Sequence, residues 1–328
     1  MDDGATSERF DYFFALNLRN NLEVLPRLLG SIVEAIQFLG PTRCALSIVE
    51  GNSPDGTADV LKAMTPFLER LGIPYFYVSS DINPKKGNRI AKLAELRNLA
   101  LQPIFEQLKE AVDSDTTVLF INDVAACSED ILELALQRRK TGAEMTCGMD
   151  WTYVGPDPTF YDVWVARGIN GDSFFEIPDN GSWDSAWNLF WNDPTSKTRL
   201  MTKKPFQVYS CWNGAAVFSA APLLEGVRFR DRKKGHCRHG EPQNFCKDLW
   251  AKGFGKIAVV PTVNLEYSNE KAIKIKKLKG YVSDLTRSEM EEDAVIEWAG
   301  PPVKVKCIES WGNQFWKPWK VSRRDLQI

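Results

Sequence analysis

The sequence predicts an α/β fold built on a mainly parallel β-sheet, and three observations support this prediction. Short runs of apolar, β-branched and aromatic residues recur through residues 1–150. Longer segments with helical spacing of apolar residues lie between them, which is the pattern of βαβ units. The chain has 328 residues, of which 44% are hydrophobic and 26% charged, so it is large enough for a substantial core.

Five strands and four helices are expected in this first half. The strands are YFFALNL (12–18), CALSIVEG (44–51), PYFYVSS (74–80), TVLFIND (117–123) and AEMTCGMDW (143–151). The helices are expected at residues 22–40, 55–72, 89–108 and 128–142. Gly40 and Gly72 end the first two helices, as C-terminal caps do. Asp55 or Thr57 is the expected N-cap of the second helix, and Ser128 that of the fourth.

After residue 150 the chain becomes rich in tryptophan, glycine, asparagine and proline. Trp183, Trp187 and Trp191 are four residues apart, so on a helix they share one face. We expect this face to pack into the core, and the alternative is a rim on which sugar rings stack. KIAVVPTVNLEY (256–267) is the expected last strand, followed by a lysine-rich segment and a tail.

Charge and motifs exclude several classes of function. The 41 basic and 43 acidic residues nearly cancel, so neither nucleic acid nor a membrane is an expected partner. The chain has no apolar run long enough for a bilayer and no signal peptide. It also has no GxGxxG after the first strand, no P-loop, no HExxH and no GxSxG. Five lysines lie close together in the sequence, and we expect them on a solvated helix face: Lys271, Lys274, Lys276, Lys277 and Lys279.

The cysteines and histidines give weaker signals. We expect four cysteines in apolar stretches to be small buried residues: Cys44, Cys127, Cys147 and Cys211. Cys237 and Cys246 lie in a polar region, where a disulfide would form in an oxidising compartment. The histidines, His236 and His239, are near these two cysteines, but the spacing matches no usual zinc finger. Asn180-Gly181-Ser182 is a glycosylation sequon.

Residues that follow the strands are the candidates for a binding site, because parallel sheets bind ligands at the carboxyl ends of their strands. Asn122-Asp123 ends a strongly apolar strand. Asp123 would either cap the following loop, pair with an arginine, or hold a metal ion with a bound ligand, and the local pattern leaves these alternatives open. Arg89 and Arg97 would face the same site or lie on the surface.

Seven segments together resemble one known family, the fungal capsule-associated α-1,3-mannosyltransferases of glycosyltransferase family 69. They are FFALNLRNNLEVLPRLL, IVEGNSPDGT, LAELRNLALQP, FINDVAACSEDILEL, CWNGAAVF, GEPQNFCKDLW and VPTVNLEYSNEKAIKIKKLKGY, in this order over residues 13–281. The resemblance implies a GT-A fold with helices on both faces of a Rossmann-like sheet and an irregular acceptor half. It also implies GDP-mannose as donor, Mn²⁺ or Mg²⁺ as cofactor, a mannoside or oligosaccharide acceptor, and a retained α-1,3 linkage.

The resemblance also implies a domain organisation and a location. A catalytic domain would cover residues 1–260, with a nucleotide-binding half (1–150) and an acceptor half (151–260). The C-terminal strand, lysine-rich segment and tail (261–328) would pack on the same domain. Family members are usually type II membrane proteins of the Golgi, and this chain lacks the expected N-terminal anchor, so a lumenal piece is expected and a cytosolic protein is the alternative. A lumenal location would favour the sequon and a bridge between Cys237 and Cys246.

Carried over by position, the resemblance assigns donor-side roles. The nucleoside pocket would be lined by Asn17, Leu18 and Arg19, and Glu50 would bind the edge of the base. Arg89 and Arg97 would face the donor phosphates. Asn122 and Asp123 stand where the family has its metal-binding acids, but the second acid would fall at Ala125 and is missing. The second metal ligand is therefore unknown, with His239, Glu241 or the loop after Tyr267 as candidates.

On the acceptor side, the turn Trp212-Asn213-Gly214 would lie over the transferred sugar. Glu241, at the start of a helix, would be the catalytic carboxylate that contacts the sugar or the acceptor, together with Asp123. A helix-terminal acid explains its position nearly as well. The alternatives to this function are an inactive glycan-binding protein of the same fold and a transferase that uses another nucleotide sugar.

Overall fold

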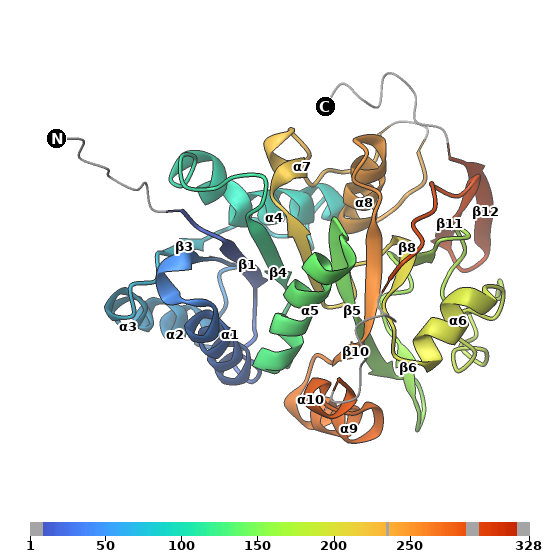
Figure 1. The fold of residues 1–328 in the computed structure, drawn as a ribbon, viewed down its shortest axis with the longest axis horizontal. Helices are drawn as coiled ribbons and strands as arrows, with labels where there is room; N and C mark the ends of the chain where they lie inside the picture. Colours follow the sequence, from blue (N-terminus) through green and yellow to red (C-terminus); the bar gives the residue numbers. More distant parts are fainter. Residues whose placement is uncertain (1–8, 234–235, 287–294, 320–328) are drawn as a thin grey trace.

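The computed structural model describes residues 9–233, 236–286 and 295–319 (Figure 1). The strands are β1 (Tyr12–Leu18), β2 (Cys44–Glu50), β3 (Tyr75–Ser79), β4 (Thr117–Ile121), β5 (Met145–Tyr153), β6 (Pro158–Phe160), β7 (Arg167–Gly168), β8 (Phe206–Ser210), β9 (Ala215–Ser219), β10 (Ile257–Leu265), β11 (Lys304–Ser310) and β12 (Asn313–Pro318). The helices are α1 (Leu25–Leu39), α2 (Thr57–Ala63), α3 (Thr65–Arg70), α4 (Arg89–Glu106), α5 (Ser128–Thr141), α6 (Pro194–Met201), α7 (Ala221–Leu224), α8 (Glu241–Ala251), α9 (Asn269–Lys279) and α10 (Val282–Leu285), with a 3₁₀ turn at Pro41–Arg43. Within these ranges no helix has the length and apolar character that crossing a bilayer requires.

One sheet runs through the whole molecule in the order β3-β2-β1-β4-β9-β5-β10-β8-β7, and β6 pairs with β5. Strands β1 to β4 are parallel, and β5 is parallel to β10. Because β9 is antiparallel to both β4 and β5, the two parallel groups point the same way. The carboxyl ends of β1, β2, β4, β5 and β10 therefore lie at one edge of the sheet. This arrangement confirms the predicted α/β fold with a mainly parallel central sheet.

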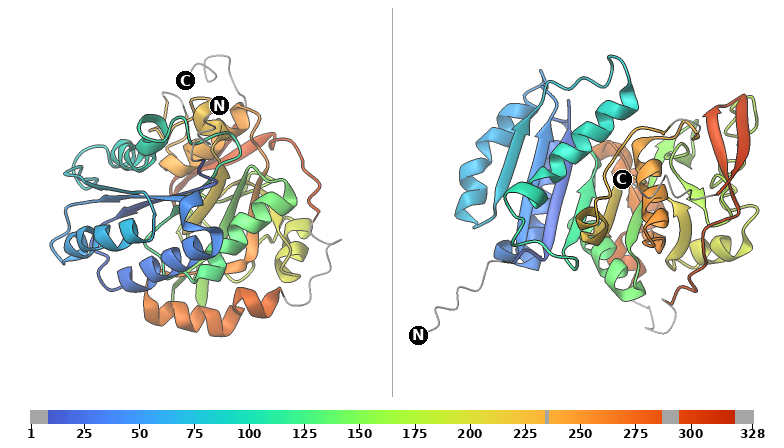
Figure 2. Two further views of the ribbon diagram at one scale, coloured as in Figure 1. Left: turned by 60° about the vertical axis from the view of Figure 1, so that its left-hand side comes forward. Right: turned by 90° about the horizontal axis from the view of Figure 1, so that it is seen from above.

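Helices cover both faces of the sheet, as predicted (Figures 1 and 2). Helices α1 and α5 contribute to the apolar core on one face, and α4, α7 and α8 contribute to the core on the other. In α1 the buried residues Leu25, Leu28, Leu29, Ile32 and Ile36 follow the three-to-four-residue spacing that predicted the helix.

Local details differ from the prediction in two helices. Residues 55–72 form two helices rather than one, because Pro66 has no N–H to continue α2 through the break at Met64. The N-cap of α5 is Cys127 rather than Ser128, and the Asp130 carboxylate accepts a hydrogen bond from the Cys127 N–H at 2.9 Å. The N-cap of α2 is Gly56 rather than Asp55 or Thr57, although the Asp55 carboxylate accepts from the Thr57 N–H at 3.0 Å.

The predicted tryptophan face does not exist, because residues around Trp183 and Trp187 form turns. The Asn180 side chain accepts from the Ser182 N–H at 2.9 Å, and the Ser182 hydroxyl accepts from the Asp184 N–H at 3.1 Å. These bonds to side chains replace helical ones. Trp187 is 82% exposed, whereas Trp183 packs on Phe175 with ring centroids 5.4 Å apart.

The C-terminal part also contains structure that the sequence analysis missed. Strand β10 spans residue 260, where the catalytic domain was expected to end. After it, β11 and β12 pair as an antiparallel hairpin. The hairpin lies at the end of the molecule opposite β3 (Figure 2). The lysine-rich segment is helix α9, as expected, but Lys276 is buried in an ion pair with Asp130 and is not on the solvated face.

Two disulfides correct the cysteine predictions. Cys147 and Cys211, expected as unpaired buried residues, are bonded to each other. Cys237 is bonded to Cys307 rather than to Cys246. The reason is the packing of α8, which buries the Cys246 thiol against the Cys211 carbonyl oxygen at 3.4 Å, while β11 brings Cys307 to Cys237. Burial raises the pKa of the Cys246 thiol to about 12.

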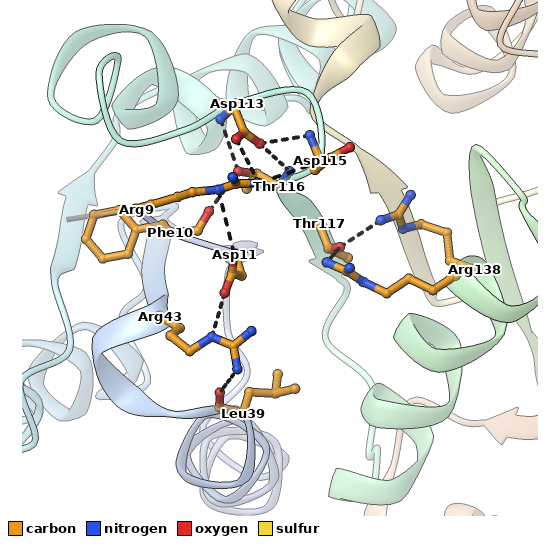
Figure 3. A network of polar contacts seen from close by, with 11 residues as sticks. Arg9, Phe10, Asp11, Leu39, Arg43, Asp113, Asp115, Thr116, Thr117 and Arg138 are labelled. Carbon is orange, nitrogen blue, oxygen red and sulfur yellow. Dashed lines mark hydrogen bonds and ion pairs between the residues drawn. The ribbon is translucent and has the colours of Figure 1, made fainter. Parts of the chain in front are cut away.

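The opposite, amino-terminal edge of the sheet is held by a network of structural ion pairs (Figure 3). Arg43 Nε lies 2.5 Å from the Asp11 carboxylate, beside the start of β1. Arg138 donates to the Thr117 hydroxyl at 2.9 Å, at the start of β4. These arginines connect the ends of α1 and α5 to the starts of β1 and β4, which gives the amino-terminal edge a structural role.

Candidate active site

A pocket of about 460 Å³ opens at the carboxyl edge of the sheet. Its lining comes from α4, from the ends of β4 and β10, from the loop after β6, from the turn before β9, and from the start of α8. The lining residues are Arg89, Ile90, Leu93, Arg97, Asn122, Tyr161, Asp162, Trp164, Val165, Trp212, Arg238, His239, Gly240, Glu241, Pro242, Tyr267, Ile308 and Glu309. Six of the predicted site residues are among them: Arg89, Arg97, Asn122, Trp212, His239 and Glu241.

An ion pair between Arg97 and Glu241 lies at the wall of this pocket. Arg97 Nε donates to Glu241 Oε1 at 2.9 Å, and the side chains are only 12% and 4% exposed. The Arg97 guanidinium also lies over the Trp212 ring, 4.4 Å from its centroid, and 5.1 Å from that of Phe120. Glu241 therefore has a fixed position, and Arg97 brings positive charge to the pocket.

The sequence around Glu241 explains why it faces the pocket. Gly240 is the N-cap of α8 and Pro242 lies in its first turn, so the helix begins at Glu241. An acidic side chain is stabilised at a helix N-terminus by the helix dipole. The expected helix start at Glu241 is thus present, and the carboxylate is held both by the helix end and by Arg97.

The turn Trp212-Asn213-Gly214 joins β8 to β9, as predicted. Trp212 Nε1 donates to Asn122 Oδ1 at 3.0 Å, which ties the turn to the end of β4. Asn213 and Gly214 both have positive φ values, of 51° and 82°. A Cβ on Gly214 would lie 3.1 Å from Val124 and 3.4 Å from the Asp150 Cβ, so this position favours glycine.

Two carboxylates that the sequence analysis missed lie beside this turn. Asp162 accepts a hydrogen bond from the Asn213 N–H at 3.0 Å, and Asp150 accepts one from the Tyr267 hydroxyl at 2.7 Å. Asp150 is completely buried, and its Oδ1 has no hydrogen-bond partner in the described parts of the chain. Loss of hydration raises the pKa of Asp162 to about 6. Burial, together with the nearby Asp162 charge, raises the pKa of Asp150 well above its usual range.

Asp123 lies close to this acidic group but is itself partly exposed. Its Oδ2 accepts a hydrogen bond from the Asn21 side chain at 2.9 Å. Burial is the main cause of a raised pKa at Tyr161, and the charges of Asp150, Asp162 and Asp123 add to it. Tyr161 thus has three carboxylates around it, although Asp123 is not part of the pocket lining.

The predicted donor residues at the ends of β1 and β2 lie outside the pocket. Leu18 is buried, and Arg19 Nε donates to the Gly51 carbonyl at 2.9 Å. The Asn17 side-chain amide lies between the Leu96 carbonyl and the Arg97 N–H, and in the orientation that satisfies both it donates to the first at 3.1 Å and accepts from the second at 3.2 Å. The Glu50 carboxylate is buried and accepts from the backbone N–H groups of the following loop, at Asn52 (3.0 Å) and Ser53 (2.7 Å).

His239 belongs to a second group. A ring nitrogen of His239 lies within 4.8 Å of the sulfurs of Cys237 and Cys307. Among the described residues, these three side chains form the group that could hold a metal ion by the closeness of their ligand atoms. Both sulfurs are used in the disulfide. Burial, reinforced by the charges of Arg167 and Lys247, lowers the pKa of His239 well below its ordinary value. The same positive charges disfavour a divalent cation at His239.

The carboxylates fit a divalent cation better. Mn²⁺ and Mg²⁺ prefer oxygen ligands, and the Asp150 oxygen without a partner shows that the local charge is not compensated by protein groups. The pocket thus has a fixed Arg–Glu pair and Asp162 in its lining, with Asp150 behind Tyr267, a combination suited to holding a polar, negatively charged ligand through a cation.

Comparisons with known proteins find relatives of this chain. The chain is 38% identical over 322 residues to the alpha-1,3-mannosyltransferase CMT1 of Cryptococcus neoformans, covering 92% of this chain and 68% of that protein.

Solved structures give more distant matches. TarS of S. aureus (residues 1–349) matches with 15% identity and a TM-score of 0.44, over 86% of this chain and 67% of that chain. The mannosyltransferase PcManGT of Pyrobaculum calidifontis, in complex with GDP-Man and Mn²⁺, matches with 12% identity and a TM-score of 0.46, over 79% and 57%.

A family model described as Cryptococcal mannosyltransferase 1 matches residues 11–248, which contain every strand of the large sheet except β10, together with Asp123, Asp150, Asp162 and the Arg97–Glu241 pair. The chain therefore belongs to the Cryptococcal mannosyltransferase 1 family.

Proposed function

We propose that the chain is a metal-dependent glycosyltransferase that moves mannose from GDP-mannose to a mannoside and forms an α-1,3 linkage with retention. The observation that carries this proposal is the pocket at the carboxyl edge, which Arg97, Glu241 and Asp162 line in a chain of this family. Retention follows from the chemistry, because the bond that breaks in GDP-mannose and the bond that forms are both α.

The donor would span the end of β4 and the ends of β1 and β2, with the nucleotide in the half formed by residues 1–150. Asn17, Leu18 and Arg19 stay candidates for the nucleoside side. Glu50 is a candidate for the base edge through the lone pairs that its loop leaves free. Arg89 and Arg97 line the pocket and supply positive charge near the diphosphate.

Asp123 is the proposed metal ligand, with the neighbouring carboxylates as better partners than His239. A bound Mn²⁺ or Mg²⁺ would neutralise charge on the departing diphosphate. Asp123 would hold the cation, and Tyr267 would shield the buried Asp150 carboxylate from water.

Glu241 is the proposed catalytic carboxylate on the sugar side. Its ion pair with Arg97 keeps it at a fixed place at the pocket wall, where it would contact the transferred mannose or the acceptor hydroxyl. Trp212, Asn213 and Gly214 would shape the site of the sugar, because their turn links Asn122 to Asp162. The acceptor would enter from the half formed by residues 151–260.

We propose a location in the lumen of the Golgi, with the cytosol as the alternative. The two disulfides support an oxidising compartment, where such bonds persist. Asn180 of the sequon is exposed, as glycosylation requires. The expected partners are a nucleotide sugar and a glycan, and not a nucleic acid.

A thermal-unfolding series with GDP, UDP and ADP, each with and without Mn²⁺, tests the donor and the metal. A ligand that binds the folded state at a hundredfold excess over its dissociation constant stabilises it by about 2.7 kcal/mol. We expect GDP, and neither UDP nor ADP, to raise the unfolding temperature, and to do so only when Mn²⁺ is present. A shift with UDP would contradict the donor, and no shift with any nucleotide would favour an inactive glycan-binding protein.

A further inference from the structure

The mouth of the pocket carries exposed aromatic rings that the proposed donor site does not use. Tyr161 and Trp164 line the pocket, yet 47% and 44% of their surfaces are exposed. Large apolar side chains exposed together at a cleft commonly mark a binding surface. Their position at the pocket mouth makes this surface continuous with the proposed site of transfer.

The loop after β6 carries both rings, and its residues alternate between buried and exposed positions around Trp164. Val163 and Val165 are buried in the core, whereas Trp164 between them is exposed. Hydrogen bonds from the Val163 N–H to the Tyr161 carbonyl (2.8 Å) and from the Ala166 N–H to the Asp162 carbonyl (3.0 Å) hold the loop in a tight turn. Tyr161, Asp162 and Trp164 therefore reach the pocket from one short segment.

Contacts from other elements keep the rings in place. Trp164 stacks on Trp311, from the turn between β11 and β12, with centroids 4.2 Å apart and planes inclined by 27°. Trp311 fits closely over Gly181, where a Cβ would lie 2.4 Å from the indole. Tyr161 packs against Tyr267 at 5.0 Å. A surface fixed from three segments loses little side-chain entropy when a ligand binds.

We propose that Tyr161, Trp164 and Trp311 form the acceptor-binding rim, on which the pyranose rings of an uncharged α-mannoside stack. This inference rests on the proposed function and names the place where its acceptor binds. A pyranose ring has an apolar C–H face that matches an aromatic ring, and hydroxyl groups at its edge that need polar partners. The carboxylates of Asp162 and Glu309 line the same pocket and accept hydrogen bonds from such hydroxyls.

A ligand-observed NMR titration that measures the binding of α-1,3-mannobiose tests the rim without requiring transfer. We expect Trp164→Ala and Tyr161→Ala each to weaken mannobiose binding at least tenfold, and Trp164→Phe to recover part of the loss because a ring is kept. Trp187→Ala is the matched control, since Trp187 is 82% exposed and lies outside the pocket lining. It should bind mannobiose as the unchanged chain does. Unfolding curves verify that each variant is folded.

The same variants separate the inference from the proposed function. In transfer assays, Trp164→Ala should raise the KM for mannobiose tenfold or more and leave GDP affinity unchanged. Unchanged mannobiose binding in Trp164→Ala would overturn the rim, and so would a loss of GDP affinity, which would assign Trp164 to stacking on the base. Trp164-dependent mannobiose binding in a chain that transfers from no donor would support the rim and refute the transferase.

Discussion

Replacing Asp162 by asparagine should make the protein more stable at neutral pH and leave it unchanged in acid. Asp162 faces the pocket and accepts a hydrogen bond from the Asn213 N–H, which an asparagine oxygen also accepts. Loss of hydration raises its pKa from an ordinary 3.8 to about 6. The charged carboxylate therefore destabilises the folded state wherever it is ionised.

The effect of Asp162 on the free energy of unfolding follows from the protons that the folded and unfolded states bind. Because the folded pKa exceeds the unfolded one, the folded state binds more protons between pH 4 and 6, so stability falls as the pH rises through that window. A rise of about two pH units in a pKa corresponds to about 3 kcal/mol above pH 6, as an upper bound. Asp162→Asn removes this cost, so its advantage should be near zero at pH 4 and close to that bound at pH 7.5.

Urea unfolding of both proteins at several pH values, with EDTA present, measures this difference. Asp184→Asn is the control, because Asp184 is an exposed carboxylate outside the pocket lining. If Asp162→Asn differed from the unchanged chain by the same amount at pH 4 and pH 7.5, the assignment of a raised pKa to Asp162 would be wrong.

Three further predictions concern the proposed catalytic groups. Asp123→Ala should abolish Mn²⁺-dependent transfer and cost less than about 1.5 kcal/mol of stability, because Asp123 is partly exposed with one hydrogen bond to Asn21; unchanged turnover would refute its role. Glu241→Gln should lower kcat at least a hundredfold with GDP affinity unchanged, and a collapse of GDP binding would move Glu241 to the donor side. Arg97→Met should destabilise the fold by about 3–5 kcal/mol in urea unfolding, because it leaves the Glu241 carboxylate buried without its partner; a loss below about 1 kcal/mol would mean that the pair is not buried in solution.

Periodicity predicted most of the first half of the fold, because strands and helices there carry strong local patterns. The strand-end rule selected Asn122, whereas the roles of Arg97 and Glu241 came from the family resemblance, and all three line one pocket. Asp150 and Asp162 were missed for different reasons. Asp150 lies near the carboxyl end of β5, a position that the same rule would have selected, whereas Asp162 reaches the pocket from an irregular loop without periodicity.

Contacts between distant segments were beyond local patterns. Cys237 and Cys307 are 70 residues apart in the sequence, and Cys307 lies in the hairpin of β11 and β12. Their disulfide therefore depends on where this hairpin packs. The spacing of Trp183 and Trp187 suggested a helix, but hydrogen bonds from Asn180 and Ser182 side chains favour turns. Short polar side chains that compete for backbone groups outweighed the apolar spacing in that segment.

The product of the reaction tests the central claim most directly. The chain would be incubated with GDP-mannose, α-1,3-mannobiose and Mn²⁺, and the product analysed by mass spectrometry and by NMR of the new anomeric bond, with Asp123→Ala alongside. We expect one mannose added through an α-1,3 bond, in a reaction that needs both Mn²⁺ and Asp123. A β bond, transfer without metal, or no transfer from GDP-mannose while a UDP-sugar is used would contradict the account.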